Sequence, residues 1–317
     1  MSVESEHTIA YELLPWVDAA RLDCARLAGN PRAGAFLAAR PEKVRYCRAL
    51  AANPSALALL AASPAKLGWG WTSANPRVLE LLALNAYAPG LAPDVYSPVH
   101  LESRRNLPDS ASTPGDAEQK NAFRVDWRAL SRNPGAAPML AANTALIYWH
   151  ELSANPGAGA LFALSPSNLD WAALSANPAA AALLAASPDK VCPARLSANP
   201  APELRELLRA RSLELDWTAL SANPSPAALE LLESAPALID WAALSANPAP
   251  RALALLAANP DRICWTALSA NPAPAALAML EAAPERACWA ALSANPGIFR
   301  APAGENLESS LHGMVIA

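Results

Sequence analysis

Along most of the chain, short apolar segments alternate with Asn-Pro pairs at a nearly constant spacing. Within a segment the apolar residues recur three and four positions apart, as do Ala228, Leu229, Leu231 and Leu232, and this spacing is typical of one buried face of a helix. Alternating β-branched runs are missing, and proline at this density is excluded from central strands. The pattern therefore predicts short helices and no sheet.

The Asn-Pro pairs mark eleven copies of a unit of 22–24 residues. Their asparagines are Asn30, Asn53, Asn75, Asn133, Asn155, Asn177, Asn199, Asn223, Asn247, Asn271 and Asn295. One interval is 58 residues long, which equals a 22-residue unit plus an insertion of 36 residues. Because helices this short are unstable alone, neighbouring units must bury their apolar faces. The chain is therefore predicted to be an all-α solenoid of short helix pairs.

Each unit is predicted to contain two helices, as the unit from Asn223 to Asn247 illustrates. Asn223-Pro224 places a preferred N-cap and a favoured first residue at the start of a helix that should run to about Ser234. Asp240 is expected to cap a second helix of barely two turns. Asn247 should end that helix in the left-handed conformation and then cap the next one.

The repeats divide the chain into five parts. We expect an N-terminal cap helix at 1–20, three units at 21–87, a loop insertion at 88–122, eight units at 123–299 and a disordered tail at 300–317. The cap is expected because the terminal apolar face of an open solenoid has no neighbour to cover it. An open superhelix of eleven units at about 8–10 Å each would span on the order of 100 Å.

In its period and its Asn-Pro…Leu-x-x-Leu…Asn-Pro layout, the unit resembles that of the leucine-rich repeat variant proteins, a resemblance that implies α- and 3₁₀-helices alternating in a right-handed superhelix. Its W-x-x-L-S-x-N-P form is similar to short repeats of proteins from large DNA viruses and microalgae. The resemblance covers about 20–87 and 123–299 and implies an architecture, not an activity. Some members of the variant family hold a four-cysteine iron–sulfur cluster near the N-terminus, whereas only Cys24 and Cys47 lie there in this chain.

Tryptophan and serine also recur at fixed places in the unit. Tryptophan begins the second helix of eight units, among them Trp171, Trp217, Trp241, Trp265 and Trp289. We interpret this column as core, rather than as a ladder that stacks bases or sugars, because no basic column accompanies it. The serine four residues later and the corner asparagines are interpreted as structural groups that bond a local carbonyl or the next unit.

Composition and motifs exclude several function classes. Only 16% of the residues are charged, and the net charge of −4 comes without a Lys/Arg cluster, so nucleic acid is not an expected partner. The histidines are scattered, and no zinc, Walker or dinucleotide motif is present, so we expect no catalytic, cofactor or metal site. Five widely spaced cysteines favour an intracellular, reducing compartment, with organelle or virion association possible. The uncharged stretches 152–169 and 171–188 contain internal prolines and are interpreted as buried units, not membrane spans.

The insertion is the segment that breaks the pattern. Its residues Tyr96, His100, Arg104 and Arg105 combine aromatic and donor groups, which are the usual anchors of protein interfaces. We therefore predict that 92–106 contacts a partner, with passive disorder of the whole loop as the alternative. The predicted function is a non-catalytic scaffold or adaptor that holds other proteins. The alternatives are a structural or linker subunit embedded in a virion, cytoskeletal array or organelle complex, and an enzyme with its site in the insertion.

Overall fold

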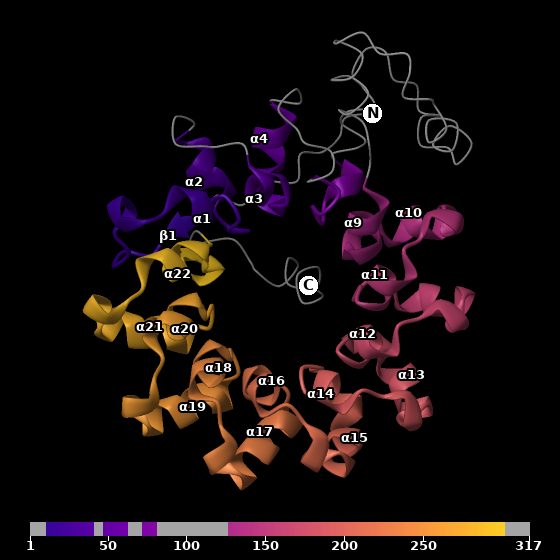
Figure 1. The fold of residues 1–317 in the computed structure, drawn as a ribbon. Coiled ribbons are helices and arrows are strands. Elements are labelled where there is room, and N and C mark those ends of the chain that lie inside the picture. The colour runs from indigo at the N-terminus through magenta and orange to yellow at the C-terminus, as the bar shows by residue number, and fades with distance from the viewer. Residues whose placement is uncertain (1–10, 41–46, 63–71, 81–125, 302–317) are drawn as a thin grey trace, which may run out of the picture.

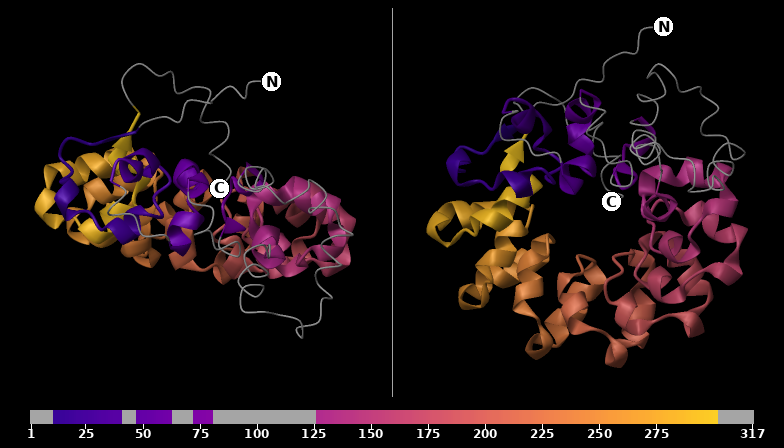
Figure 2. Two further views of the ribbon diagram at one scale, coloured as in Figure 1. Left: turned by 90° about the horizontal axis from the view of Figure 1, so that it is seen from above. Right: turned by 45° about the horizontal axis from the view of Figure 1, so that its top comes forward.

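The computed structural model describes residues 11–40, 47–62, 72–80 and 126–301. Over these residues the units form a closed ring with an inner and an outer layer of short helices (Figure 1). Seen from its edge, the ring is flat (Figure 2). The expected all-α repeat fold is confirmed, because the described residues contain only two strands of two residues each. The open superhelix is not what forms: the units close on themselves.

The inner layer consists of the helix that precedes each corner asparagine. These helices are α1 (Cys24–Leu27), α3 (Arg48–Ala51), α9 (Trp127–Arg132), α11 (Trp149–Ser153), α12 (Trp171–Ser175), α14 (Pro193–Leu196), α16 (Trp217–Ala222), α18 (Trp241–Ala246), α20 (Trp265–Ala270) and α22 (Trp289–Ala294).

The outer layer follows the corners and returns to the inner layer through 3₁₀ turns. Its helices are α2 (Gly34–Ala38), α4 (Leu57–Ala61), α10 (Ala137–Ala142), the 3₁₀-helix η8 (Gly159–Leu164), α13 (Ala181–Ala186), α15 (Arg205–Ala210), α17 (Pro226–Ser234), α19 (Pro250–Ala258) and α21 (Pro274–Ala282). The corner 3₁₀ turns are η3 (Pro54–Ala56), η6 (Pro134–Ala136), η10 (Pro178–Ala180), η12 (Pro202–Leu204) and η17 (Pro296–Ile298). The returning turns are η1 (Ala19–Arg21), η7 (Thr144–Leu146), η9 (Pro166–Asn168), η11 (Pro188–Lys190), η13 (Ser212–Glu214), η14 (Pro236–Leu238), η15 (Pro260–Arg262) and η16 (Pro284–Arg286).

Local sequence explains where the inner helices begin. Asp240 is the N-cap of α18, and its carboxylate accepts hydrogen bonds from the backbone N–H groups of Ala242 and Ala243 at 3.0 and 3.1 Å. These bonds satisfy two of the N–H groups that a helix leaves unpaired at its start. The bond from Ala243, the larger contribution, holds the pKa of the Asp240 carboxyl below its ordinary value. The predicted cap and short second helix are confirmed.

The corner asparagines differ from the expectation in two ways. Asn247 ends α18 in an extended conformation, with φ −74° and ψ 119°, and not in the left-handed one. The reason is Pro248, because the residue before a proline is confined to extended backbone. In the longer units the outer helix also begins two residues later than expected, at a second proline such as Pro226 or Pro250.

All eleven corner asparagines are buried and form one hydrogen-bonded cycle. Each Nδ2 donates to the backbone carbonyl of the preceding corner asparagine and to the carbonyl two residues before that one, at 2.7–3.1 Å. Each Oδ1 accepts from the backbone N–H two residues further along. The predicted ladder between units is confirmed, and it includes Asn177, Asn223, Asn247, Asn271 and Asn295.

The serine column joins neighbouring inner helices. Ser245 Oγ donates to the backbone carbonyl of Trp241 at 2.7 Å and accepts from the backbone N–H of Cys264, in the next unit, at 3.0 Å. The same bond occurs across the point of closure, where Ser293 Oγ accepts from the N–H of Asp23 at 2.8 Å. The serines are therefore structural, as predicted.

Leucines, not tryptophans, fill the centre of the core. The leucine three residues after the tryptophan position is fully buried, as Leu220, Leu244 and Leu268 show. The tryptophans are only partly buried, although they pack against this core. The interpretation of the tryptophan column as core therefore holds only in part for its members Trp171, Trp217, Trp241, Trp265 and Trp289.

A cation from the returning turn of the next unit covers several of these rings. Lys190 Nζ lies 4.7 Å from the ring centroid of Trp171, and the guanidinium carbon of Arg286 lies 5.0 Å from that of Trp265. Across the closure, Arg21 covers Trp289 at 4.1 Å. The junction between the last and first units thus repeats the junctions within the chain.

Both ends of the chain build the closing unit. β1 (Glu12–Leu13) pairs antiparallel with β2 (Phe299–Arg300), and the N–H of Leu14 donates to the carbonyl of Ile298 at 2.8 Å. Phe299 is 1% exposed, and its ring meets that of Phe36 edge to face, with centroids 5.7 Å apart. We call these contacts the terminal clasp.

The terminal clasp corrects the predicted N-terminal cap. Within the described part of 1–20, residues 11–20 form β1 and the start of η1 and contain no α-helix. The prediction assumed an open end whose apolar face needs a cover, and here the first unit covers the face of the last. Residues 1–10 and most of the predicted tail, 302–317, lie outside the described residues.

Candidate functional site

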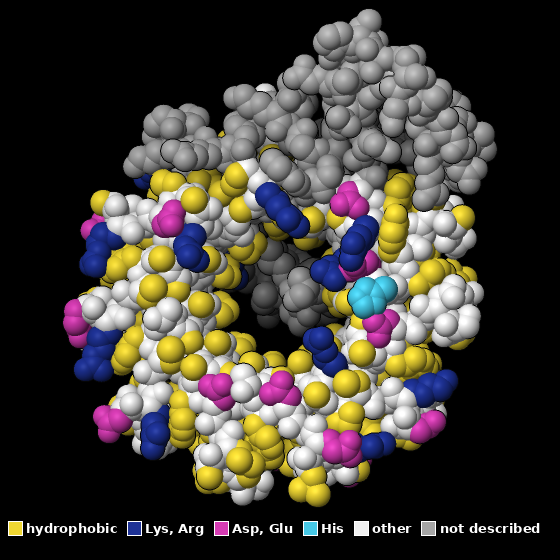
Figure 3. Space-filling view, viewed as in Figure 1, with side chains coloured by type: hydrophobic (Ala, Val, Ile, Leu, Met, Phe, Trp, Pro, Cys, Tyr) yellow, Lys and Arg dark blue, Asp and Glu magenta, His cyan; other side chains and the backbone are white. Residues whose placement is uncertain are grey.

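The exposed positions of the inner helices border an opening at the centre of the ring (Figure 3). We call this surface the inner wall and define it by the residues one and five places after the tryptophan position. In the sixth to eleventh units these positions hold only alanine or threonine. They are Ala172, Ala176, Ala194, Ala198, Thr218, Ala222, Ala242, Ala246, Thr266, Ala270, Ala290 and Ala294.

The fourth and fifth units depart from this small, uncharged wall. Arg128 and Arg132 occupy the two wall positions of α9, and His150 and Glu151 lie on α11. Asp170, the N-cap of α12, lies beside them. We call these five residues the arginine cluster. Figure 3 shows basic, acidic and histidine side chains gathered where these helices border the opening.

Glu151 is the centre of the cluster and is 5% exposed. Arg128 Nε donates to Glu151 Oε1 at 2.7 Å, and Arg132 forms an ion pair with Glu151 Oε2. Both arginines come from the neighbouring helix α9, so the pairs cross the junction between two units. The arginine side chains remain 70% and 65% exposed. One buried carboxylate thus holds two guanidinium groups at the edge of the opening.

The electrostatics keep this centre ionised. The hydrogen bond from Arg128, with the charges of Arg132 and Arg128, holds the pKa of the Glu151 carboxyl below its ordinary value, although burial alone would raise it. The same hydrogen bond raises the pKa of Arg128. The two guanidiniums and one carboxylate therefore sum to one positive charge, which the carboxylate of Asp170 in the same cluster offsets.

His150 and Asp170 form a second pair in the cluster. His150 Nδ1 lies 2.5 Å from Asp170 Oδ2, while Asp170 Oδ1 caps α12 through the N–H groups of Ala172 and Ala173. A histidine oriented by a carboxylate can serve a nucleophile as a general base. Ser153 cannot act as that nucleophile, because it is buried and its Oγ donates to the carbonyl of Trp149.

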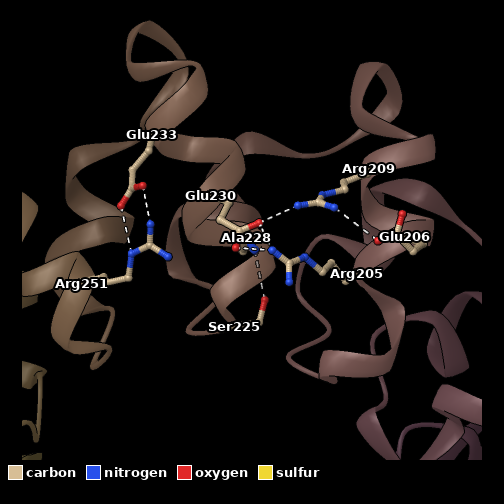
Figure 4. Close-up of polar contacts among 8 residues, drawn as sticks. All are labelled: Arg205, Glu206, Arg209, Ser225, Ala228, Glu230, Glu233 and Arg251. Carbon is tan, nitrogen blue, oxygen red and sulfur yellow. Dashed lines mark hydrogen bonds and ion pairs between the residues drawn. The ribbon is translucent and has the colours of Figure 1, made fainter.

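Ion pairs on the outer layer have a different setting (Figure 4). Glu230 on α17 binds Arg205 and Arg209 of α15, and Arg251 on α19 binds Glu233 with Nε–Oε1 at 3.1 Å. The hydrogen bond from Arg205 is the main cause of a lowered pKa of the Glu230 carboxyl. All of these carboxylates are at least 30% exposed, in contrast to Glu151. They are surface pairs that bridge neighbouring outer helices.

The residues predicted to bind a partner, Tyr96, His100, Arg104 and Arg105, lie outside the described residues, as does the whole insertion 88–122. The structure therefore tests neither their proximity nor their role. The units on either side of the insertion are joined directly, because Asn133 Nδ2 donates to the carbonyls of Ser73 and Asn75 at 2.9 and 2.7 Å. The insertion leaves the asparagine cycle unbroken.

The sequence analysis missed the arginine cluster. A signal was present: the other described inner helices that begin with tryptophan carry alanine two places after it, and α11 carries Glu151 there. Arg128 and Arg132 likewise replace the small residues of the wall. The departures form one site because consecutive units stack and place α9 beside α11.

Among the described residues no helix is long and apolar enough to cross a membrane, and no group of His, Cys, Asp and Glu could hold a metal ion. All five cysteines are free thiols. No protein-family model, no curated protein and no solved structure matches the chain. The resemblance to leucine-rich repeat variant proteins therefore stays an expectation from the residues.

Proposed function

We propose that the chain is a non-catalytic binding ring that holds a segment of another protein against its inner wall. The observation that supports this proposal is the arginine cluster, which departs from the alanine and threonine wall of the sixth to eleventh units and lies at the edge of the central opening. Arg48 on α3 is a further charged residue at a wall position. Repeat arrays use a concave surface for binding, and a closed array has its concave surface inside.

The width of the ring favours a segment over a folded domain. Eleven units whose neighbouring inner helices pack roughly 8–10 Å apart give a circle about 30 Å across between facing helix axes. A helix with its side chains is roughly 10–12 Å wide, which leaves an opening on the order of 20 Å. One helix or an extended chain fits such a width, whereas a domain of about 100 residues, with a radius of gyration near 13 Å, does not.

Site-specific photo-crosslinking tests this function. A photoreactive amino acid replaces Thr218 on the inner wall or, as a matched control, the exposed Ala254 on the outer face of α19. Each variant is expressed in the organism that makes the protein, and the products are identified by mass spectrometry. We expect Thr218 to yield a product that maps to one continuous segment of one protein, and Ala254 to yield none. Products from Ala254 alone, or from neither position, would refute the proposal.

A further inference from the structure

We propose that the arginine cluster recognises carboxylate groups, so that the segment held by the ring is an acidic one carrying Asp or Glu side chains. This inference rests on the proposed function and adds the chemistry of the partner. It concerns the residues Arg128, Arg132 and Glu151, with Tyr148 at their side.

The first argument is the geometry of the two guanidiniums. Each has five N–H donors, and Glu151 engages only part of them while more than half of each side chain stays exposed. Because Glu151 already fixes both guanidiniums, ligand binding costs them less conformational entropy than it would cost two free arginine side chains. Planar guanidinium groups match carboxylates in a two-pronged arrangement. Tyr148, the N-cap of α11, adds a 46% exposed aromatic ring.

The second argument is that the ring does not need this cluster in order to close. The other described inner helices that begin with tryptophan place alanine where Glu151 lies. A buried ion pair is on average no more stabilising than well-packed apolar residues of similar volume. Stability therefore gives no reason to keep a buried carboxylate at this one junction, whereas the presentation of two fixed guanidiniums does.

The third argument, from charge, separates a peptide carboxylate from a nucleic acid. The formal charges of Arg128, Arg132 and Glu151 sum to +1, and the carboxylate of Asp170 in the same cluster offsets this charge. Two guanidiniums in such a setting can bind an isolated carboxylate but form no run of cations. The helix caps Asp126, Asp170, Asp216 and Asp240 add negative charge to the same layer of helices. A polyphosphate backbone needs a continuous run of cations, and these caps interrupt any such run.

The test measures binding of defined peptides to the full chain by fluorescence anisotropy. The probes are a fluorescein-labelled Glu/Ala peptide, its Gln/Ala counterpart, a phosphoserine peptide of the same length and a single-stranded oligonucleotide. We expect the Glu/Ala peptide to bind at least about tenfold more tightly than the others, since hydrogen bonds to charged groups contribute about 1.5–3 kcal/mol. Its affinity should fall as salt is added.

The decisive variant restores the wall of the other units. Arg128→Ala, Glu151→Ala and Arg132→Ala together reproduce the residues Ala172, Ala173 and Ala176 of α12, so that no buried charge is left unpaired. We expect this variant to fold and to bind the Glu/Ala peptide at least about tenfold more weakly, one guanidinium contact being worth that much. The outer-layer control, Arg205→Gln with Arg251→Gln, should bind like the wild type.

Two outcomes would overturn the inference: equal binding of the Glu/Ala and Gln/Ala peptides by the wild type, or undiminished binding by the folded triple variant. Tighter binding of the phosphoserine peptide or the oligonucleotide would likewise overturn it and indicate a phosphate site. Crosslinks from Thr218 to a segment without acidic residues would remove this inference but leave the binding ring intact. If Thr218 gives no crosslink to any partner segment, the proposed binding ring is itself refuted.

Discussion

At the scale of single residues, each corner asparagine uses its whole side-chain amide. Asn247 donates from Nδ2 to the carbonyls of Ser221 and Asn223, both at 2.9 Å, and accepts from the N–H of Ala249 at 3.0 Å. No water can replace these bonds, because Asn247 is fully buried. A buried backbone group left without a partner costs about 1–3 kcal/mol.

Asn247→Ala should therefore lower the free energy of unfolding by about 3 kcal/mol or more, since it leaves three backbone groups unpaired. The control is Asn259→Ala, because Asn259 is only partly buried and makes one bond, to the carbonyl of Leu255 at 2.8 Å. We expect less than about 1.5 kcal/mol there. Denaturant titration gives both values, and native-state hydrogen exchange should localise the loss to 223–271. Equal losses in the two variants would contradict the special role of the corner.

The lowered pKa of Glu151 predicts a pH dependence of stability. A carboxyl whose pKa is lower in the folded state than in the unfolded state stabilises the fold above its unfolded pKa, about 4.3 for Glu, and this contribution is lost as the pH falls through the folded pKa. The unfolding free energy of Glu151→Gln should thus lie below that of the wild type at pH 7 and approach it near pH 3. Denaturant titrations at the two pH values check this. The control Glu281→Gln, at an exposed position of α21, should have an unfolding free energy close to that of the wild type at both pH values. A difference in unfolding free energy between Glu151→Gln and the wild type that does not change with pH would contradict the prediction.

Much of this residue-scale chemistry could be predicted from the sequence. Fixed spacing identified the asparagines and serines as structural groups, and their bonds confirm it. The prediction of a left-handed conformation for Asn247 was wrong, because Pro248 restricts the preceding residue more strongly than the helix end does. Glu151 was missed because a single substitution in a repeat has no period, and periodicity was the signal being used.

At the scale of the elements, the corner between two units allows little space beside the backbone. A Cβ added at Gly135 would lie 1.9 Å from the carbonyl oxygen of Pro76 in the preceding unit, whereas one at Gly29 would make its nearest contact at 3.6 Å, with Ala49 Cβ. Gly135 follows its corner Asn-Pro pair directly, at the junction where the insertion precedes the fourth unit. This junction depends on the close approach of the two backbones.

Gly135→Ala should accordingly push the third and fourth units apart and destabilise the fold by about 1–3 kcal/mol, the usual cost of overpacking. Gly29→Ala should be neutral or stabilising by up to about 1 kcal/mol, because alanine fits there and restricts the unfolded chain. Thermal unfolding of the two variants, side by side, makes the comparison. A Gly135→Ala protein as stable as Gly29→Ala would show that the close approach at Pro76 does not exist.

The helices themselves were predictable, and their boundaries less so. Cap residues and prolines set the start of α18 and the end of α17 as expected. The start of the outer helices was misplaced where the corner reads Asn-Pro-x-Pro, because the second proline also satisfies the rule for a first helical residue. The sequence alone does not say which of two competing prolines opens the helix.

At the scale of the whole molecule, curvature follows from a difference in side-chain size between the layers. Inner helices meet through alanine, serine and asparagine, apart from the Arg–Glu pairs between α9 and α11. Outer helices are bridged in places by long Arg–Glu pairs, as between α15 and α17 (Figure 4). Eleven units complete the circle, so each turns by about 33° on average. No single unit encodes this number, because small differences in turn per unit decide whether an array closes. The repeat pattern alone therefore could not predict that the array closes into a ring.

Truncation tests the terminal clasp. Removal of 305–317 should be tolerated, whereas removal of 298–317 deletes β2 with the buried Ile298 and Phe299. Loss of a buried phenylalanine side chain alone costs about 3–5 kcal/mol. The longer truncation should therefore open the ring and expose apolar surface, and the truncated protein should elute as aggregates in size-exclusion chromatography. We expect the same result for removal of 1–20. Monomeric behaviour of the 298–317 truncation would show that the clasp is dispensable.

The closed ring itself is tested most directly by one distance, between α1 and α22. Spin labels are placed at Ala25→Cys and Ala290→Cys in a chain whose five cysteines are replaced by alanine, and the distance is measured by double electron–electron resonance. Adjacent helices lie roughly 8–10 Å apart, so with both label arms a closed ring gives a single narrow peak at about 20–30 Å. An open superhelix places the same labels on the order of 100 Å apart, near or beyond the range of the method. A narrow distribution of distances at about 20–30 Å confirms the ring, and a broad distribution or the absence of that peak contradicts it.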